Sequence, residues 1–141
     1  MRGIKKILNT ENQILIYRNQ LFKLSESFIT NQAEALTGFR PVYVGRKNFG
    51  IAPNHSTFIS LEDRSLMENI KYVLFRDVSN LKEKLRDIKP TLIHAHFGVE
   101  GVYAIKLADK LQIPVVTTFH GFDATTTPFS LILSGLSLIH I

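Results

Sequence analysis

Two short stretches decide the fold of this chain, Thr91-Leu-Ile-His-Ala-His-Phe-Gly98 and Pro114-Val-Val-Thr-Thr-Phe-His-Gly-Phe-Asp123. Each begins with the apolar and β-branched residues of a buried strand and then runs into histidine, an aromatic residue and glycine. Residues 100–111 have apolar side chains at helical spacing, so the whole segment predicts a β-α-β unit. In such folds the chemistry lies at the carboxyl ends of the strands, where both stretches place histidines. The pattern therefore predicts a functional site at that edge.

The start of the chain predicts a second β-α-β unit. Residues 13–17 and 41–44 are short apolar runs with β-branched residues, as is typical of strands. Between them, Ser25 is expected to cap the amino end of a helix that Gly38 ends. Residues 45–60 are rich in turn-forming residues and are expected to form a loop.

A long helical region is predicted between these two units, and Pro90 closes it. Because strands and helices alternate along the chain, the predicted fold class is α/β, a Rossmann-like parallel sheet with helices on both faces. The helical region carries two apolar faces, one made of Leu66, Ile70, Val73 and Leu74 and the other of Val78, Leu81, Leu85 and Ile88.

The composition is that of a globular domain. The 141 residues are 45% hydrophobic and 21% charged, which argues against a disordered chain and allows a real core. The chain has no cysteine, which excludes a disulfide framework and a thiolate metal site. No signal peptide is expected at the basic amino end, and the longest apolar run, residues 129–141, is too short to span a bilayer.

The charge balance is basic, with a formal net charge of +5 and a pI of about 9.6. A modest cluster of Lys82, Lys84, Arg86 and Lys89 is either a solvated helix face or a contact with an anionic membrane surface. Aromatic residues are not interleaved with these cations as they are in proteins that bind single strands, so no nucleic-acid partner is predicted.

The end of the chain departs from the periodic pattern. The last six residues, 136–141, resemble the translation of a transposon end used to prepare DNA sequencing libraries. We therefore expect a domain over residues 1–127 and a truncated or non-native tail over residues 128–141. The alternative is a genuine short apolar strand or helix.

Histidines 94 and 96 are two apart on a strand, so both side chains point to the same face. Such a pair can begin a metal site, which His120 and Asp123 could complete. The spacings typical of zinc hydrolases are absent, and no metal is predicted. The other interpretation is that one histidine is bonded into the core and the other lies at the strand tip.

The second stretch ends in His120-Gly121-Phe122-Asp123. A histidine here can hydrogen-bond a sugar hydroxyl, Gly121 allows a tight turn and close approach of a ligand, and Asp123 can orient the histidine. A capping aspartate beside a satisfied histidine is the plain structural alternative. Two further candidates for ligand contact are Gly98, at the start of the helix, and Ser25, which serves equally well as an N-cap.

Three motifs in this order resemble the amino-terminal domain of glycosyltransferase family 4. They are Leu24-Ser-Glu-Ser-Phe-Ile29 after the first strand, Ile93-His-Ala-His-Phe-Gly98, and Thr118-Phe-His-Gly-Phe-Asp-Ala-Thr125. The resemblance covers residues 13–127 and implies half of a GT-B fold, in which two Rossmann-like domains face a cleft. Many relatives have a glycine-rich first loop. This chain lacks that loop, which puts phosphate contact there in doubt.

The resemblance implies a retaining enzyme of bacterial surface polysaccharide synthesis, such as capsule or lipopolysaccharide, at the cytoplasmic face of the plasma membrane. This domain would hold a glycan or lipid-linked acceptor, and the nucleotide-sugar donor would bind a carboxyl-terminal domain that the sequence does not contain. The fragment alone is therefore expected to be inactive. By resemblance, His120 would contact the donor sugar with Gly121 and Asp123 shaping its turn, Ser25 and Glu26 would lie on the first loop near the acceptor or the sugar phosphates, and His96 and Gly98 would line the acceptor side.

Two other functions remain open from the sequence. The first is a stand-alone binding module that kept the fold without catalysis. The second is a small metal-dependent hydrolase that uses His94, His96, His120 and Asp123.

Overall fold

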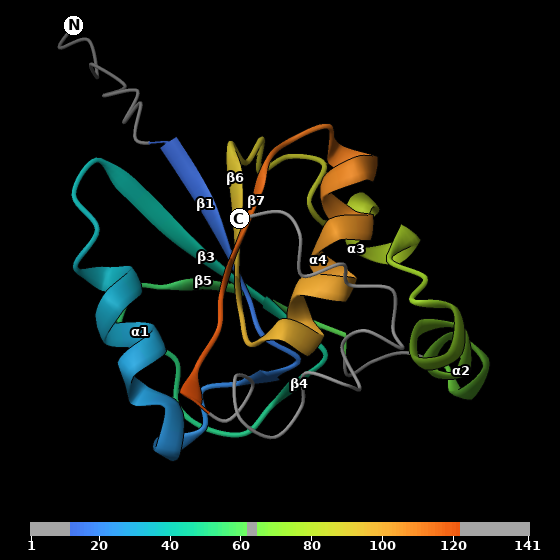
Figure 1. Ribbon diagram of the computed structural model, residues 1–141, viewed down its shortest axis with the longest axis horizontal. Coiled ribbons are helices and arrows are strands. Elements are labelled where there is room, and N and C mark those ends of the chain that lie inside the picture. Colours follow the sequence, from blue (N-terminus) through green and yellow to red (C-terminus); the bar gives the residue numbers. More distant parts are fainter. Residues whose placement is uncertain (1–11, 62–64, 122–141) are drawn as a thin grey trace, which may run out of the picture.

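The computed structural model describes residues 12–61 and 65–121. They form a parallel five-stranded sheet in the order β5-β3-β1-β6-β7, with helices on both faces, which confirms the predicted α/β, Rossmann-like fold (Figure 1). The predicted domain end at residue 127 and the tail 128–141 lie outside the described residues. The strands of the sheet are β1 (Asn12–Tyr17), β3 (Phe39–Gly45), β5 (Thr57–Ser60), β6 (Leu92–His96) and β7 (Val115–Thr118).

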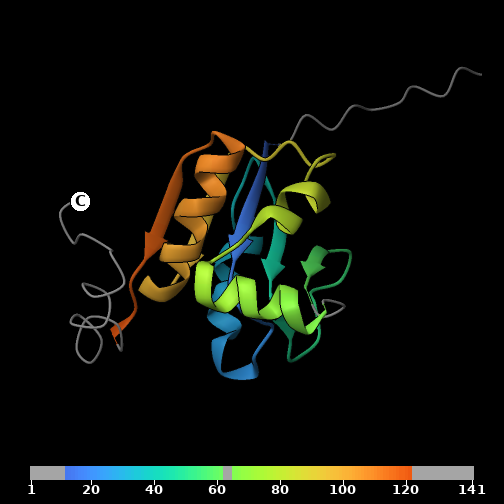
Figure 2. The same ribbon diagram turned by 90° about the vertical axis from the view of Figure 1, so that its right-hand side faces the viewer.

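Four helices cover the sheet. On one face lies α1, and on the other lie α2, α3 and α4, which Figure 2 shows side by side in front of the strands. A short 3-10 turn, Leu24–Glu26, precedes α1, and a small second sheet pairs β2 (Gln20–Leu21) with β4 (Lys47–Asn48). The helices are α1 (Ser27–Glu34), α2 (Leu66–Phe75), α3 (Ser79–Lys84) and α4 (Gly98–Leu111).

The two faces of the sheet bury separate apolar clusters. Along β1, Leu15 and Tyr17 pack with the helices α2, α3 and α4, while Ile14 and Ile16 pack with α1. All four side chains are at most 3% exposed, because β1 has a strand on each side and a helix layer on each face. A central parallel strand of this kind reads as a continuous apolar run, as residues 13–17 do.

The order of the strands reverses between β1 and β6. The chain moves from β1 outward through β3 to β5, then returns to the other side of β1 as β6 and continues to β7. In open α/β sheets, ligands bind at the carboxyl edge where the order reverses, because the loops after the two central strands diverge there. The segments that follow β1 and β6 are therefore the first place to look for a site.

The expected loop over residues 45–60 is wrong in part, since it contains β4 and β5. Strand β5 pairs with β3 in register, with Val42 opposite Thr57 and Gly45 opposite Ser60. The strand has only four residues and lies at the edge of the sheet, so it lacks the long apolar run that marks a central strand.

The predicted N-cap role of Ser25 is also wrong. Ser25 lies inside the 3-10 turn, and α1 begins at Ser27 with Glu26 at its N-cap position and no side-chain cap. The helix ends at Glu34, before Gly38, whose φ of +78° serves the turn that leads into β3.

The long helical region is divided into α2 and α3. Ser65 and Glu68 form a capping box that starts α2, and Arg76 in the left-handed conformation ends it. The predicted apolar face of α3 is buried, since Val78, Leu81 and Leu85 are at most 1% exposed.

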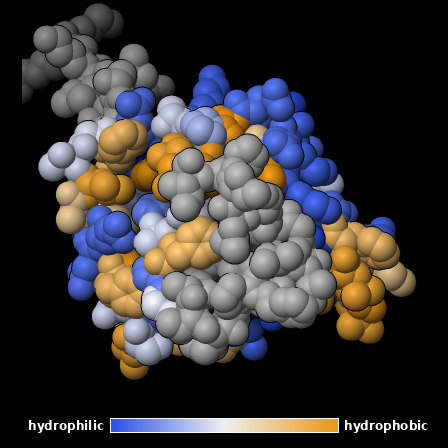
Figure 3. Space-filling view, in the orientation of Figure 1, coloured by the Kyte–Doolittle hydropathy of each residue, from blue (hydrophilic) through white to orange (hydrophobic). Residues whose placement is uncertain are grey.

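The predicted apolar face of α2 exists but points to solvent. Leu66 is 78% exposed and Leu74 is 68% exposed, and Figure 3 shows apolar surface on the right, where α2 lies in Figure 1. Instead, Tyr72 docks the helix. Its ring stacks on Tyr103, and its hydroxyl donates to Asn19 Oδ1 at 2.6 Å and is bonded to the hydroxyl of Tyr17. These contacts of Tyr72 fix which side of α2 is buried.

Helix α4 lies against β6 and β7. Its residues Ala104, Leu107 and Ala108 are buried as predicted, and Gly101 lets the helix approach β7. A Cβ at Gly101 would lie 2.8 Å from Thr117 Oγ1. In the part of the chain that the structure describes, no helix is both long enough and apolar enough to cross a membrane.

We expect Gly101→Ala to lower the free energy of unfolding by about 1–3 kcal/mol, because the new methyl group overpacks the contact with Thr117. Chemical denaturation measures this change. Adding Thr117→Ala should remove the clash and restore part of the lost stability. Equal destabilisation by Gly101→Ala in both backgrounds would show that the close approach to Thr117 is not the cause.

Candidate functional site

Three imidazole rings lie in contact toward the carboxyl edge of β6 and β7. The ring centroids of His94 and His96 lie 4.3 Å apart on the same face of β6, as their spacing predicts. The ring of His120, which follows β7, lies 5.5 Å from that of His96 at an interplanar angle of 14°. His96 Nδ1 lies 3.3 Å from His120 Nε2, and His94 Nε2 lies 2.7 Å from Thr118 Oγ1. The structure thus places His96 and His120 at neighbouring strand tips, as expected.

Burial keeps the inner part of this stack uncharged. Burial, together with the neighbouring groups His94, His120 and Arg18, lowers the pKa of His96 from its usual 6.5 to about 3. Burial also lowers the pKa of His94, with His120 adding to the effect. Within the described residues, the buried Nε2 of His96 has no hydrogen-bond partner. An unsatisfied nitrogen of this kind costs about 1–3 kcal/mol, and such costs call for an explanation, of which function is one.

Aromatic rings hold His120 from two sides. The ring of Phe28, in the first turn of α1, lies 4.8 Å from the imidazole, and that of Phe97, between β6 and α4, lies 4.5 Å from it. Phe97 has φ +72° and ψ 148°, a conformation that costs a residue with a side chain about 1–3 kcal/mol. Backbone strain of this kind persists only where the surrounding contacts impose it, and it gathers at functional sites.

A charged cluster that the sequence pattern did not predict lies beside these rings. Arg18, the first residue after β1, donates from Nε and Nη2 to the two carboxylate oxygens of Glu26, each at 2.8 Å. Its Nη1 donates to Glu100 in the first turn of α4. The guanidinium carbon lies 4.5 Å from the centroid of the Phe97 ring, an attractive cation–π contact. Arg18 therefore links the first loop to the turn at Phe97, whose ring contacts His120.

Glu100 is only 4% exposed, and burial raises the pKa of its carboxyl group while Arg18 acts against that rise. Two carboxylates thus share one guanidinium, which leaves few donors of Arg18 for a further anion. A signal for this cluster was present in the sequence. Arg18 comes directly after β1 and Glu100 comes shortly after β6, so the topology places both at the edge where the strand order reverses.

The other predicted residues have different places. Ser25 is exposed on the first loop, Gly98 is buried at the start of α4, and Gly121 is exposed as the last described residue. Asp123 and Phe122 lie outside the described residues. Across residues 12–61 and 65–121, no group of three or more His, Asp or Glu side chains is arranged to hold a metal ion.

Comparison with known proteins shows the family to which the chain belongs. Residues 38–139, more than half of the chain, match the model of Glycosyltransferase Family 4. A segment of 46 residues is 46% identical to the putative teichuronic acid biosynthesis glycosyltransferase TuaC of Bacillus subtilis (strain 168). That match spans 32% of this chain and 12% of the relative's length. On the evidence of the family match and the Rossmann-like sheet, the chain belongs to glycosyltransferase family 4.

Proposed function

We propose that this chain is the acceptor-side, amino-terminal domain of a retaining glycosyltransferase. The enzyme would move a sugar from a nucleotide-sugar to a glycan or lipid-linked acceptor in bacterial surface polysaccharide synthesis. Family membership supports this proposal, and so does the name of the B. subtilis relative, which refers to teichuronic acid biosynthesis. By resemblance to the family, a second domain would hold the nucleotide-sugar, and the enzyme would work at the cytoplasmic face of the plasma membrane.

The observation that carries the proposal is the setting of His120. Its ring stacks on His96 and lies between Phe28 and Phe97, at the carboxyl edge of the sheet. A nitrogen of an imidazole can donate to or accept from a sugar hydroxyl, and a ring already held by its neighbours loses little freedom when a ligand binds. We therefore assign His120 to contact with the transferred sugar.

Two glycines and one serine, Gly121, Gly98 and Ser25, complete the proposed binding surface. Among the described residues, no atom lies within 4 Å of a Cβ built at Gly121, so this part of the turn leaves room for a ligand. Gly98 lies at the amino end of α4, where backbone N–H groups favour an anionic oxygen. Ser25 is exposed on the first loop and is proposed to face the acceptor. Asp123 keeps its proposed role of shaping the turn after His120, outside the described residues.

Three charged or buried groups are proposed to act by positioning others. His96 is fully buried and orients His120 through the contact between their ring nitrogens. Arg18 is engaged by Glu26 and Glu100, so it fixes the site and does not itself bind the sugar phosphates. Glu26 then contributes through Arg18, which differs from the direct ligand contact suggested by the sequence.

We expect His120→Asn to lower kcat/KM for sugar transfer by about 100-fold in the full-length enzyme that contains this domain, because the imidazole contact is lost. Transfer of a radiolabelled sugar to the acceptor measures the effect. His55→Asn is the matched control, since His55 is exposed in the loop before β5 and asparagine tolerates its φ of +62°. Equal activities for the two variants would contradict the role of His120.

We expect Arg18→Met to lower the free energy of unfolding of this chain by about 3–5 kcal/mol, because two nearly buried carboxylates lose their cation. Adding Glu100→Gln should recover part of that loss, since one of the uncompensated charges is removed. Arg40→Met, at an exposed position of β3, should change the stability by less than about 0.5 kcal/mol. Urea unfolding of the four proteins measures these differences, and a lack of recovery would contradict the shared ion pair.

The depressed pKa of His96 predicts that stability falls with acidification. As the pH falls below 6.5, the usual pKa of histidine, the unfolded state binds a proton at His96. The folded state does not bind this proton until about pH 3. The loss from this group accumulates over that window to at most roughly 5 kcal/mol. His96→Gln should flatten the dependence measured by denaturation at successive pH values. An unchanged slope would show that His96 is not held neutral.

A further inference from the structure

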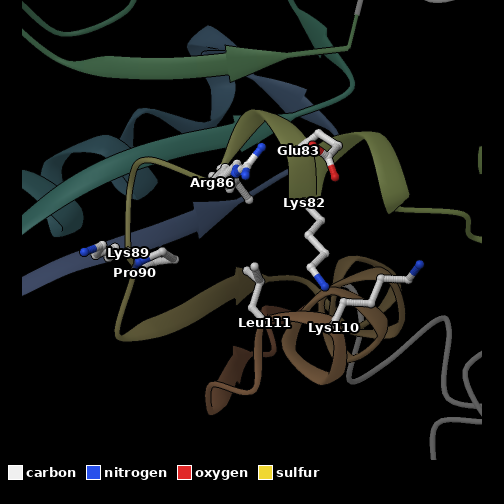
Figure 4. Close-up of a pocket in the computed structure, with 8 residues that line it drawn as sticks. Lys82, Glu83, Arg86, Lys89, Pro90, Lys110 and Leu111 are labelled. Atoms are coloured by element: carbon white, nitrogen blue, oxygen red, sulfur yellow. The ribbon is translucent and has the colours of Figure 1, made fainter.

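A second concave surface lies at the opposite edge of the sheet. It is a hollow of about 330 Å³ between the end of α3, the turn that follows it and the end of α4 (Figure 4). Its residues 82–90 precede β6, and Lys110 and Leu111 precede β7, so the hollow lies beside the amino ends of these strands. In Figure 2 the strands point away from this end of α3 and α4. The hollow is therefore separate from the surface around His96 and His120.

The lining of the hollow is strongly basic. Four cationic side chains contribute to it, those of Lys82, Arg86, Lys89 and Lys110, against the single carboxylate of Glu83. Within residues 12–61 and 65–121, no salt bridge engages these four cations. Lys110 donates to the neutral hydroxyl of Ser79 at 2.8 Å. The hollow thus concentrates positive charge that the described part of the protein does not neutralise.

Favourable interaction with the carboxyl end of a helix explains the positions of only two of the four cations. Lys82 and Lys110 lie in the last turns of α3 and α4, where cations stabilise the helix carboxyl ends. Arg86 and Lys89 lie beyond the last turn of α3, outside the range of that effect. Lys84, which belongs to the same basic run, turns away and donates to the carbonyl oxygen of Ser60 at 3.0 Å. Within this run, Lys84 therefore faces away from the hollow, while Lys82, Arg86 and Lys89 line it.

The hollow has an apolar component beneath its charges. Leu85 is 1% exposed and belongs to the core, and Leu111 and Pro90 are half-buried. Figure 4 shows Lys82 extending from α3 toward the end of α4, where Leu111 lies. Charges set beside low-dielectric walls attract a counter-ion more strongly than charges on a flat, fully solvated surface.

We propose that this hollow binds the phosphate group of a ligand. A phosphate monoester carries a charge of about −1.5 to −2 at neutral pH, which suits a hollow lined by four cations and one carboxylate. The guanidinium of Arg86 can bind two oxygens at once, and the lysines act as mobile point charges. The volume lies at the small end of ligand sites, which fits a phosphate with a small attached group. The source is either a soluble phosphorylated molecule or the headgroup of an anionic phospholipid.

The test titrates the 141-residue chain in a chloride buffer, followed by amide NMR, with two probes. One probe is inorganic phosphate, and the other is vesicles of phosphatidylglycerol in phosphatidylcholine. The Lys82→Gln/Arg86→Gln variant removes two cations of the hollow. The matched control, Lys84→Gln/Arg40→Gln, removes the same charge from exposed positions that do not line it. All four positions are exposed, so circular dichroism should show the same fold for both variants.

We expect amides of residues 82–90, 110 and 111 to respond to a probe. The hollow variant should bind about tenfold more weakly while the control variant binds as the parent chain does. The affinity should also fall as salt is added. A response to phosphate identifies a soluble ligand, and a response to vesicles alone identifies the headgroup, so each supports the proposal. No response to either probe, or an equal loss in both variants, overturns it.

Discussion

The ion pairs of Arg18 constrain the site more than any other contact. One guanidinium binds Glu26 on the first loop and Glu100 on α4, and its face lies over Phe97. These contacts hold together segments that leave β1 and β6 in different directions, and they help to impose the strained backbone of Phe97. His120 rests on that ring. A substitution of Arg18 is therefore expected to alter the packing of the histidine rings through Phe97, without a direct contact between Arg18 and these rings.

The sequence predicted those features that depend on local pattern and on parallel topology. The β-α-β unit around α4 and the meeting of His96 with His120 follow from periodicity, since parallel strands end at one edge. The Arg18 cluster was missed because its partners lie 8 and 82 residues away in the chain, a pairing that only the folded topology creates. The exposure of the apolar face of α2 was missed for a related reason, because periodicity identifies a face without stating what it meets.

The two edges of the sheet carry opposite kinds of chemistry. At the carboxyl edge, burial lowers the pKa values of His94 and His96, and the guanidinium of Arg18 is paired with two carboxylates. At the amino edge, the hollow beside Lys82 and Arg86 keeps its charge and stays open to solvent. By the two proposals made above, one edge binds hydroxyl-rich ligands and the other binds phosphate. A single Rossmann-like layer separates the two, so both surfaces can be occupied at the same time.

The position of β1 at the centre of the sheet also bears on how the nascent chain folds. This strand is synthesised before both of its neighbours. It can pair with β3 once residues 39–44 are made, but residues 14–17 pair with residues 92–95 only after the ribosome has made them. Closing so long a loop is entropically costly and slows folding. During translation one edge of β1 stays unpaired, with apolar side chains on both faces, and this is the state in which a chaperone would meet the chain.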